Sequence, residues 1–409
     1  MARTKTLSLF TFIDAFGWEI LQRHAFLDDL LTIKIPLGTV FGYSSTCIPT
    51  ILTGKLPREH GHLSFFYYAP QQSPFGICRA LRFLPRSLTR RGRVRRIMSR
   101  LIQRYYGYTG YFQIYNMPFQ YLHLFDYSEK RDIYQPGGIN GGVPTIFDVL
   151  RQRRIPFHLS DWRRSEEENL KALTAALEEG SIRFAYLYMA SMDAILHAHG
   201  TRSPLVSQKI AWYEEQLRRV IALAQKTYPH VRVYVFSDHG QADVECLCDL
   251  MTKIESLKLR FGVDYAAVYD STMARFWFLN DSARQRIIEV LEADPHGRIL
   301  SEQQLAAYGC DFPDHKYGEL FFLVDPGVLI CPSFMGETPL AAMHGYDPDH
   351  KDSLAMLASN VTPDPMPRRL EDMYALMVSE VTEHPGDFAL VDQSGAPTTS
   401  EMDSLPCSA

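Results

Sequence analysis

The segment VRVYVFSDHG, residues 231–240, holds the strongest structural signal in this sequence. Its apolar run ends in two adjacent ionisable residues, Asp238 and His239, which are poor core material. Gly240 then permits a tight turn that lets both side chains face a cleft. We interpret the run as a strand buried on both faces, with polar residues where it ends. Taken alone, the pattern also fits an Asp238 that caps a helix beside an uninvolved His239.

Two other segments repeat this pattern. LSLFTFID (7–14) and RFAYLYMAS (183–191) are apolar runs of the same kind, and the segment 203–228 carries apolar residues at helical spacing. A strand, a helix and a strand, with a polar residue at each strand end, are typical of an open sheet whose ligands bind beyond the carboxyl ends of the strands. We therefore predict an α/β fold with a doubly wound, mainly parallel sheet.

The rest of the chain divides by composition. PTIFDVLRQRRIPFHLSDW (144–162) adds a helix and a strand to this core, whereas the segment before it is aromatic and rich in arginine. We predict a core formed by 1–64, 140–250 and 336–385, a cap insertion over the site (65–139, "the cap"), a small α+β insert (251–335, "the insert") and a polar, disordered tail (386–409).

Overall charge excludes some functions. The net charge of -5 and the pI near 6.3 argue against general nucleic-acid binding. The seven cysteines form no CxxC pair, which favours a reducing compartment. The N-terminus is basic and then apolar, but its apolar run is shorter than that of a typical signal peptide. No stretch of the sequence approaches the roughly 20 apolar residues of a membrane span. We expect a cytoplasmic protein.

One segment departs from the acidic average. Residues 79–106 contain ten arginines, and from residue 93 onward arginines and apolar residues fall on different sides of a possible helix. Three interpretations remain open: a solvated face paired with the protein's own acids, a cap that gathers an anionic substrate, or peripheral contact with anionic lipid. The tyrosines that follow could stack on a base or sugar, or pack the core of the cap.

Five short motifs stand out in chain order: FTFIDAFGW, SSTCIPTILTG, MDAILHAHG, FSDHGQ and MHGYDP. Four of them place Asp or His near predicted strand ends, and SSTCIPTILTG supplies candidate nucleophiles. Asp193 and His197 are four residues apart, so a helix would put them on one face. A site for two divalent metals needs carboxylates and neutral imidazoles that converge from separate strands, with an oxygen nucleophile between the ions. The motifs together supply these groups.

In this order the motifs resemble the alkaline-phosphatase superfamily, and within it the type I phosphodiesterase/nucleotide pyrophosphatase family. The resemblance implies an alkaline-phosphatase-like fold and a hydrolase that cleaves a phosphodiester or pyrophosphate bond in a small anionic phosphate ester. It also implies a covalent phospho-enzyme intermediate and two divalent ions, zinc first, with Mn²⁺ or Mg²⁺ as alternatives. Two other functions stay open: a phosphomonoesterase or phosphotransferase, and an inactive binding protein of the same fold.

Each ligand of the family maps to one position here. The resemblance assigns one metal to Asp193, His197 and His344. It assigns the other metal to Asp14, Asp238, His239 and the nucleophile.

The nucleophile is placed by the frame that follows it. In the family a helix closes on Thr-Gly, then come Pro and His-Gly, which correspond here to Thr53-Gly54, Pro57 and His60-Gly61. Counting back nine residues from Thr53 gives Ser44. At a helix N-terminus its alkoxide and a bound phosphate would both be stabilised.

Several neighbours of Ser44 compete for this role. The proline usual after the family's nucleophile is absent, so Ser45 and Thr46 stay alternatives. Cys47 begins a run similar to the Cys-x-Pro-Ser-Arg motif of sulfatases, but Ile51 stands where that motif needs Arg. The family's phosphate-binding Asn after His-Gly is missing as well, and His62 or Ser64 could replace it.

Overall fold

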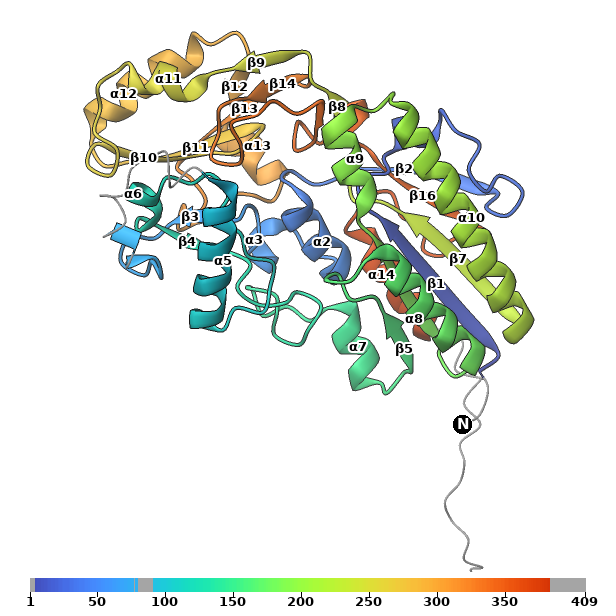
Figure 1. Ribbon diagram of the computed structural model, residues 1–409. Coiled ribbons are helices and arrows are strands. Elements are labelled where there is room, and N and C mark those ends of the chain that lie inside the picture. Colours follow the sequence, from blue (N-terminus) through green and yellow to red (C-terminus); the bar gives the residue numbers. More distant parts are fainter. Residues whose placement is uncertain (1–3, 77, 80–90, 383–409) are drawn as a thin grey trace, which may run out of the picture.

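A computed structural model describes residues 4–76, 78–79 and 91–382, and the predicted tail (386–409) lies outside these residues. At its centre is a six-stranded sheet in the order β2-β16-β7-β1-β6-β5 (Figure 1). The strands are β1 (Thr6–Ile13), β2 (Ile33–Leu37), β5 (Phe157–Leu159), β6 (Phe184–Met189), β7 (His230–Phe236) and β16 (Ala355–Ser359).

The sheet is mainly parallel, as predicted. β1 pairs in parallel with both β6 and β7, and β5 continues the parallel arrangement beside β6. Only β16 runs the other way, between β7 and β2. The predicted α/β class is confirmed, and the three apolar runs recognised in the sequence are β1, β6 and β7.

Helices cover both faces of this sheet. Along β1, Leu7 and Leu9 point into a core formed with α8 (Glu166–Glu179), α9 (Ser191–His199) and α10 (Pro204–Thr227). Phe10 and Phe12 point to the other face, where α2 (Ser44–Thr53), α7 (Ile146–Gln152) and α14 (Asp372–Thr382) pack (Figure 1). The strands are apolar on both faces because both faces are covered.

The exits of the two central strands lie against each other. A Cβ on Gly17, just after β1, would lie 2.3 Å from the Cα of Gly240, just after β7. Only glycine allows the two backbones to come this close. The turn glycine recognised after Asp238 and His239 thus brings the carboxyl ends of β1 and β7 together.

The insert contains a second, antiparallel sheet in the order β10-β11-β13-β12. Its elements are α11 (Leu250–Glu255), β10 (Tyr265–Tyr269), β11 (Met273–Phe278), α12 (Asp281–Glu292), β12 (Gly297–Ile299), α13 (Glu302–Ala307) and β13 (Leu320–Val324). Within the cap, β3 (Phe66–Tyr68) pairs with β4 (Phe125–Tyr127), and α5 (Gly92–Tyr106) and α6 (Phe119–Leu122) lie between them in the chain.

The cap and the insert share one hydrophobic core. Phe66, Ile102 and Phe112 of the cap belong to the same buried cluster as Val268 and Trp277 of the insert. The two units therefore form one wall beside the core sheet (Figure 1). The predicted domain boundaries stay a prediction.

Short elements complete the chain near the carboxyl edge of the sheet: α1 (Trp18–Leu21), α3 (Pro57–His60), β8 (Ala242–Asp243), β9 (Cys246–Cys248), β14 (Val328–Ile330), β15 (Ala342–Met343) and a 3₁₀ turn (Lys351–Ser353). β9 pairs with β14 and β8 pairs with β15. No helix in the described part of the chain is long and apolar enough to cross a bilayer.

A buried ion pair ties the insert to the start of the cap. The Arg275 side chain on β11 is fully buried, and its Nε lies 3.0 Å from an oxygen of the buried Asp270. Its other nitrogens donate to the Ser64 hydroxyl and to the carbonyl oxygens of Phe66 and Tyr317.

We predict that Arg275→Met lowers the free energy of unfolding by about 3–5 kcal/mol, because Asp270 is then left buried without its partner. Urea denaturation followed by circular dichroism measures this. The matched control Arg219→Met removes an exposed ion pair and costs less than about 1 kcal/mol. Arg275→Met/Asp270→Asn should be less destabilised than Arg275→Met alone, and equal losses would contradict the ion-pair argument.

Candidate metal-dependent active site

Six predicted ligands meet at the carboxyl edge of the central sheet. They come from the ends of β1 and β7, from α9 after β6, and from the turn after β15: Asp14, Asp193, His197, Asp238, His239 and His344. α9 places Asp193 and His197 on one helical face, as their spacing predicted. The structure thus brings all six residues together.

Two of the carboxylates are almost completely buried. Asp238 uses one oxygen to accept from the amides of Ala15 and His239, both at 3.1 Å, while its Oδ2 has no hydrogen bond. Asp14 accepts from the hydroxyl of Tyr188 at 2.7 Å, and its Oδ1 has no partner. Burial raises the pKa of Asp238 to about 7, and burial together with Asp238 raises the pKa of Asp14 well above its usual value.

The third carboxylate lies among the histidines. An oxygen of Asp193 lies 3.1 Å from His197 Nε2 and 3.6 Å from His344 Nε2, and Gln241 donates to it at 2.6 Å. Burial acts to raise the pKa of Asp193, but the neighbouring His197, whose own pKa is raised, outweighs it and holds the pKa of Asp193 below the usual value. The electrostatics of this carboxylate therefore depend on positive charge beside it.

Two histidines are held so that Nε2 faces the cluster. Nδ1 of His197 lies 2.9 Å from the carbonyl oxygen of Ala342, and Nδ1 of His239 lies 3.0 Å from that of Gly240. Because a carbonyl only accepts, Nδ1 donates in both rings, so Nε2 carries the lone pair whenever the ring is neutral. This is the orientation that a metal-binding histidine needs.

His344 completes the cluster through packing. Its ring stacks on His239 with centroids 3.8 Å apart, and its Nδ1 has no hydrogen-bond partner. Burial and the neighbouring His239 hold the pKa of His344 well below its usual value, so the ring is neutral. A neutral imidazole is the form that binds a metal.

The donor set fits metal ions. Asp193, His197 and His344 could share one ion, and Asp14, His239 and Asp193 could share another, because the ligand atoms within each group lie within 4.8 Å of one another. The unpartnered Oδ2 of Asp238 lies 3.2 Å from His239 Nε2, so it faces the second group. Carboxylates with raised pKa values and open oxygens are what a cation would stabilise.

Ser44 lies at the start of α2 and at the edge of this cluster. Its Oγ lies 3.0 Å from Nε2 of His239. Thr46 is fully buried and its hydroxyl donates to the carbonyl oxygen of Leu63, so it faces away from the cluster. The hydroxyl of Ser45 is buried without a partner.

The other sequence candidates are packed elsewhere. Cys47 is a buried residue of α2, with its thiol 3.6 Å from the Thr39 hydroxyl, and burial raises the pKa of this thiol well above the usual value. His62 is buried and its Nε2 accepts from the amide of Asn140, which makes it a structural residue and not a phosphate ligand. Ser64 does line the cavity, but its hydroxyl donates to Asp270.

A cavity of about 510 Å³ opens beside Ser44, Asp193 and His344. The cap forms part of its wall with six residues: Phe65, Tyr111, Tyr115, Glu129, Ile133 and Tyr134. Among the described residues no lysine or arginine lines it. The arginines of α5 therefore do not form the anionic-substrate site considered from the sequence, and residues 80–90 of that segment lie outside the described residues.

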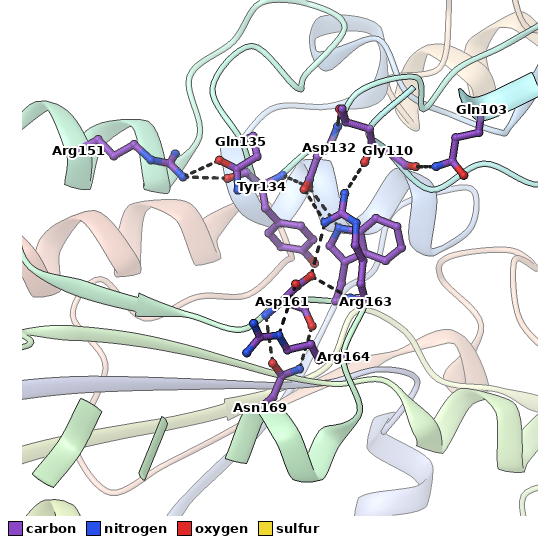
Figure 2. A network of polar contacts seen from close by, with 12 residues as sticks. Gln103, Gly110, Asp132, Tyr134, Gln135, Arg151, Asp161, Arg163, Arg164 and Asn169 are labelled. Atoms are coloured by element: carbon purple, nitrogen blue, oxygen red, sulfur yellow. Dashed lines mark hydrogen bonds and ion pairs between the residues drawn. The ribbon is translucent and has the colours of Figure 1, made fainter. Parts of the chain in front are cut away.

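A polar network holds the cap to the core beside this cavity (Figure 2). The buried Asp132 accepts from Arg163 at 3.0 Å, from the indole of Trp162 at 3.3 Å and from the amide of Tyr134. Trp162 and Tyr134 both line the cavity. The network thus fixes two aromatic side chains of the wall.

Sequence reasoning missed the residues that support the ligands. Tyr188 lies within β6, one residue before that strand ends, and Gln241 follows the Asp238-His239-Gly240 motif directly. Glu129 of the cavity wall was missed too, because no motif surrounds it. Only the position of Gln241 gave a signal that could have been used.

Together the fold and the cluster define a metallohydrolase of the α/β class. Residues 10–347 match the type I phosphodiesterase / nucleotide pyrophosphatase family, and the chain belongs to this family. The protein is therefore a metal-dependent hydrolase of phosphodiester or pyrophosphate bonds.

Solved structures agree on the fold. Murine ectonucleotide pyrophosphatase/phosphodiesterase 5 has a TM-score of 0.66 at 14% identity, over 92% of this chain and 95% of that one. An inactive variant of the murine protein in complex with AMP gives a TM-score of 0.64 at 14% identity, with the same coverage. The human ectonucleotide pyrophosphatase/phosphodiesterase 5 has a TM-score of 0.63 at 14% identity, over 92% of this chain and 94% of that one. No curated protein matches by sequence.

We predict that Asp238→Asn loses metal without unfolding. The amide oxygen can still accept from Ala15 and His239, whereas the amide nitrogen cannot ligate a cation. Elemental analysis after loading with Zn²⁺ should show a lower metal content than in the exposed control Asp281→Asn, at an unchanged melting temperature. Full metal content in Asp238→Asn would refute the assigned role.

Proposed function

We propose that this protein hydrolyses a phosphodiester through a covalent phosphoserine on Ser44, at a site that holds two divalent metal ions. The observation that carries the proposal is the position of the Ser44 hydroxyl, at a helix N-terminus and 3.0 Å from His239, beside a cavity lined by Asp14 and Asp193. No other described hydroxyl of the candidate segment combines these features.

The chain's own groups account for the two displacements. Ser44 Oγ attacks phosphorus, the bond from phosphorus to one ester oxygen breaks, and that group leaves as an alcohol. Water then attacks the phosphoserine, so that its oxygen ends on the phosphate and a proton returns to Ser44 Oγ. Amides at the start of α2 favour phosphate oxygens in both steps.

Metal ions would make Ser44 a competent nucleophile near neutral pH, and would neutralise charge on the phosphate. Asp193, His197 and His344 would hold one ion, and Asp14, Asp238, His239 and Ser44 the other. Mixed carboxylate and imidazole ligands suit zinc. The test is to remove the metal with a chelator and then add single ions back. If Mn²⁺ or Mg²⁺ restores activity and Zn²⁺ does not, the zinc assignment is overturned.

The cavity favours a diester over its alternatives. Phosphomonoesters and pyrophosphates carry an extra negative charge, and apart from the proposed metal ions no described lysine or arginine lines the cavity to offset it. A faster reaction with p-nitrophenyl phosphate than with its bis-ester would favour the monoesterase alternative. The inactive binding protein is disfavoured because all six Asp and His ligands are present and converge.

We predict that Ser44→Ala lowers kcat for bis(p-nitrophenyl) phosphate by roughly a thousandfold or more, because the attacking oxygen is lost. Ser45→Ala is the matched control, since it removes the neighbouring hydroxyl and keeps Ser44. Trapping the ³²P-labelled intermediate by acid quench, followed by peptide mapping, identifies the residue. A label on Ser45 or Thr46, or turnover retained by Ser44→Ala, would contradict the assignment.

We also propose that α5 binds an anionic lipid surface, the third interpretation of the arginine-rich segment. Ile97, Leu101 and Tyr105 form a stripe along the helix and are 57%, 57% and 80% exposed. Four exposed arginines border the stripe, and none forms an ion pair with a described residue: Arg93, Arg96, Arg100 and Arg104. An exposed apolar stripe edged by arginine is typical of helices that lie in a membrane interface.

The opposite side of α5 connects this surface to the cavity. The guanidinium of Arg95 donates to the carbonyl oxygens of Tyr115 and Met117, and Tyr115 lines the cavity. Ile102 is buried in the shared core. A surface that binds α5 would therefore lie close to the cavity wall.

We predict that the protein sediments with vesicles containing phosphatidylglycerol but not with pure phosphatidylcholine vesicles, because the arginines need an anionic surface. Ile97→Ser/Leu101→Ser/Tyr105→Ser should abolish this binding. The control Leu205→Ser/Met366→Ser removes exposed apolar side chains elsewhere and should keep it. An absence of vesicle binding by the unaltered protein would refute the lipid surface, and would leave an acidic protein as the partner to test.

The cytoplasmic location expected from the cysteine pattern stays a proposal. Its support is that the six described cysteines are free thiols. Fractionation of cells that express the tagged full chain tests it, and recovery of the protein outside the cytoplasm would overturn it.

A further inference from the structure

One carboxyl group in the cavity wall has no role in the proposed chemistry. Glu129 follows β4 in the cap and lines the cavity. Within the described residues, its carboxylate takes part in no hydrogen bond or ion pair. Polar groups turned into a binding cavity without a protein partner are available to a ligand.

Aromatic rings form the surface around this carboxyl group. Phe65 contacts Tyr111 and Tyr115 with ring centroids 5.5 Å apart in each pair, and Tyr111 lies edge-on to Trp162 at 6.1 Å. A hydrogen bond of 3.0 Å joins the hydroxyls of Tyr111 and Tyr115. All four rings line the cavity, and the Arg163 guanidinium already lies over the Trp162 ring, 4.2 Å from its centroid. Aromatic faces beside a carboxylate are the chemistry that recognises an ammonium group.

The charges around Glu129 favour a cationic ligand. The nearby Asp132 is already paired with Arg163, and the other titratable groups that interact with Glu129 are tyrosines 111, 115, 127 and 134. Burial and Asp132 raise the pKa of Glu129 to about 8. A bound cation would offset both effects, because it stabilises the ionised carboxylate.

The same cavity also contains the candidate catalytic residues. Ser44, Asp193 and His344 lie at its catalytic side, where the phosphate reacts, and Glu129 and the aromatic rings belong to the same continuous volume. We propose that this cavity binds a small phosphodiester one of whose ester groups carries a cationic ammonium group, with Glu129 as its counter-ion. The inference rests on the proposed function and names its substrate class.

Two chromogenic diesters test the inference. The first, p-nitrophenylphosphorylcholine, carries a quaternary ammonium group, whereas bis(p-nitrophenyl) phosphate carries none. For the unaltered protein we expect kcat/KM to favour the cationic diester. Glu129→Gln should reduce kcat/KM for p-nitrophenylphosphorylcholine by about tenfold or more, and should leave kcat/KM for bis(p-nitrophenyl) phosphate, which has no ammonium group, nearly unchanged. Glu292→Gln, an exposed carboxylate on α12, is the matched control and should change neither rate.

The pH dependence gives a second readout. Because the carboxyl group binds a cation only when ionised, the ratio of the two kcat/KM values should rise as the pH rises through about 8. Taking the ratio cancels titration of the shared catalytic groups. Glu129→Gln should remove the rise.

The outcomes separate this inference from the proposed function. Equal losses on both diesters in Glu129→Gln, or no preference for the cationic diester, would overturn the cation site while diesterase activity stands. If neither diester is hydrolysed, the protein is titrated with tetramethylammonium chloride, and NMR measures whether the cation binds. Binding that Glu129→Gln abolishes would then support the cation site although the proposed function has failed, and no binding would refute it.

Discussion

Carboxylates buried beside one another constrain the carboxyl edge of the central sheet. Asp14, Asp193 and Asp238 come from segments far apart in the chain and meet where little solvent reaches them. Burial raises the pKa values of Asp14 and Asp238, and the neighbouring carboxylates add to this effect. The surrounding groups satisfy only half of each of these two carboxylates. Amides and a tyrosine hydroxyl donate to one oxygen of each of these two carboxylates, and the other oxygen stays open toward the histidines.

The positions of Asp14 and Asp238 could be predicted from the sequence because each follows an apolar strand. In a parallel sheet the strand ends lie at one edge, so both residues were expected at the same edge once β1 and β7 were recognised. Asp193 and His197 needed only the helical spacing of four. Ser44 was located by its distance from Thr53-Gly54, which holds because α2 runs without interruption between them.

What the sequence could not predict depends on contacts between distant segments. Tyr188 reads as one more apolar strand residue, and its hydrogen bond to Asp14 exists only because β6 pairs with β1. Nothing in the sequence joins the cap to the insert either, although Phe66 and Trp277 belong to one buried cluster. In the sequence Glu129 looks like an ordinary charged surface residue, and only the folded structure shows that it lines the cavity.

The arginine-rich segment shows how charge in a sequence can mislead about a site. Ten arginines beside a candidate phosphate site suggest a basic pocket, yet no described arginine lines the cavity. On α5 the exposed arginines border an apolar stripe, whereas Arg95 turns inward and holds the Tyr115 and Met117 carbonyls in place. The two sides of the cap therefore carry opposite charges. Arginines are exposed on α5 at its outer side, and the carboxyl group of Glu129 lines the cavity at its inner side. A ligand that reaches the cavity past an anionic surface would need a cationic group to match Glu129, so the chemistries of the two sides are compatible although the evidence for each is independent.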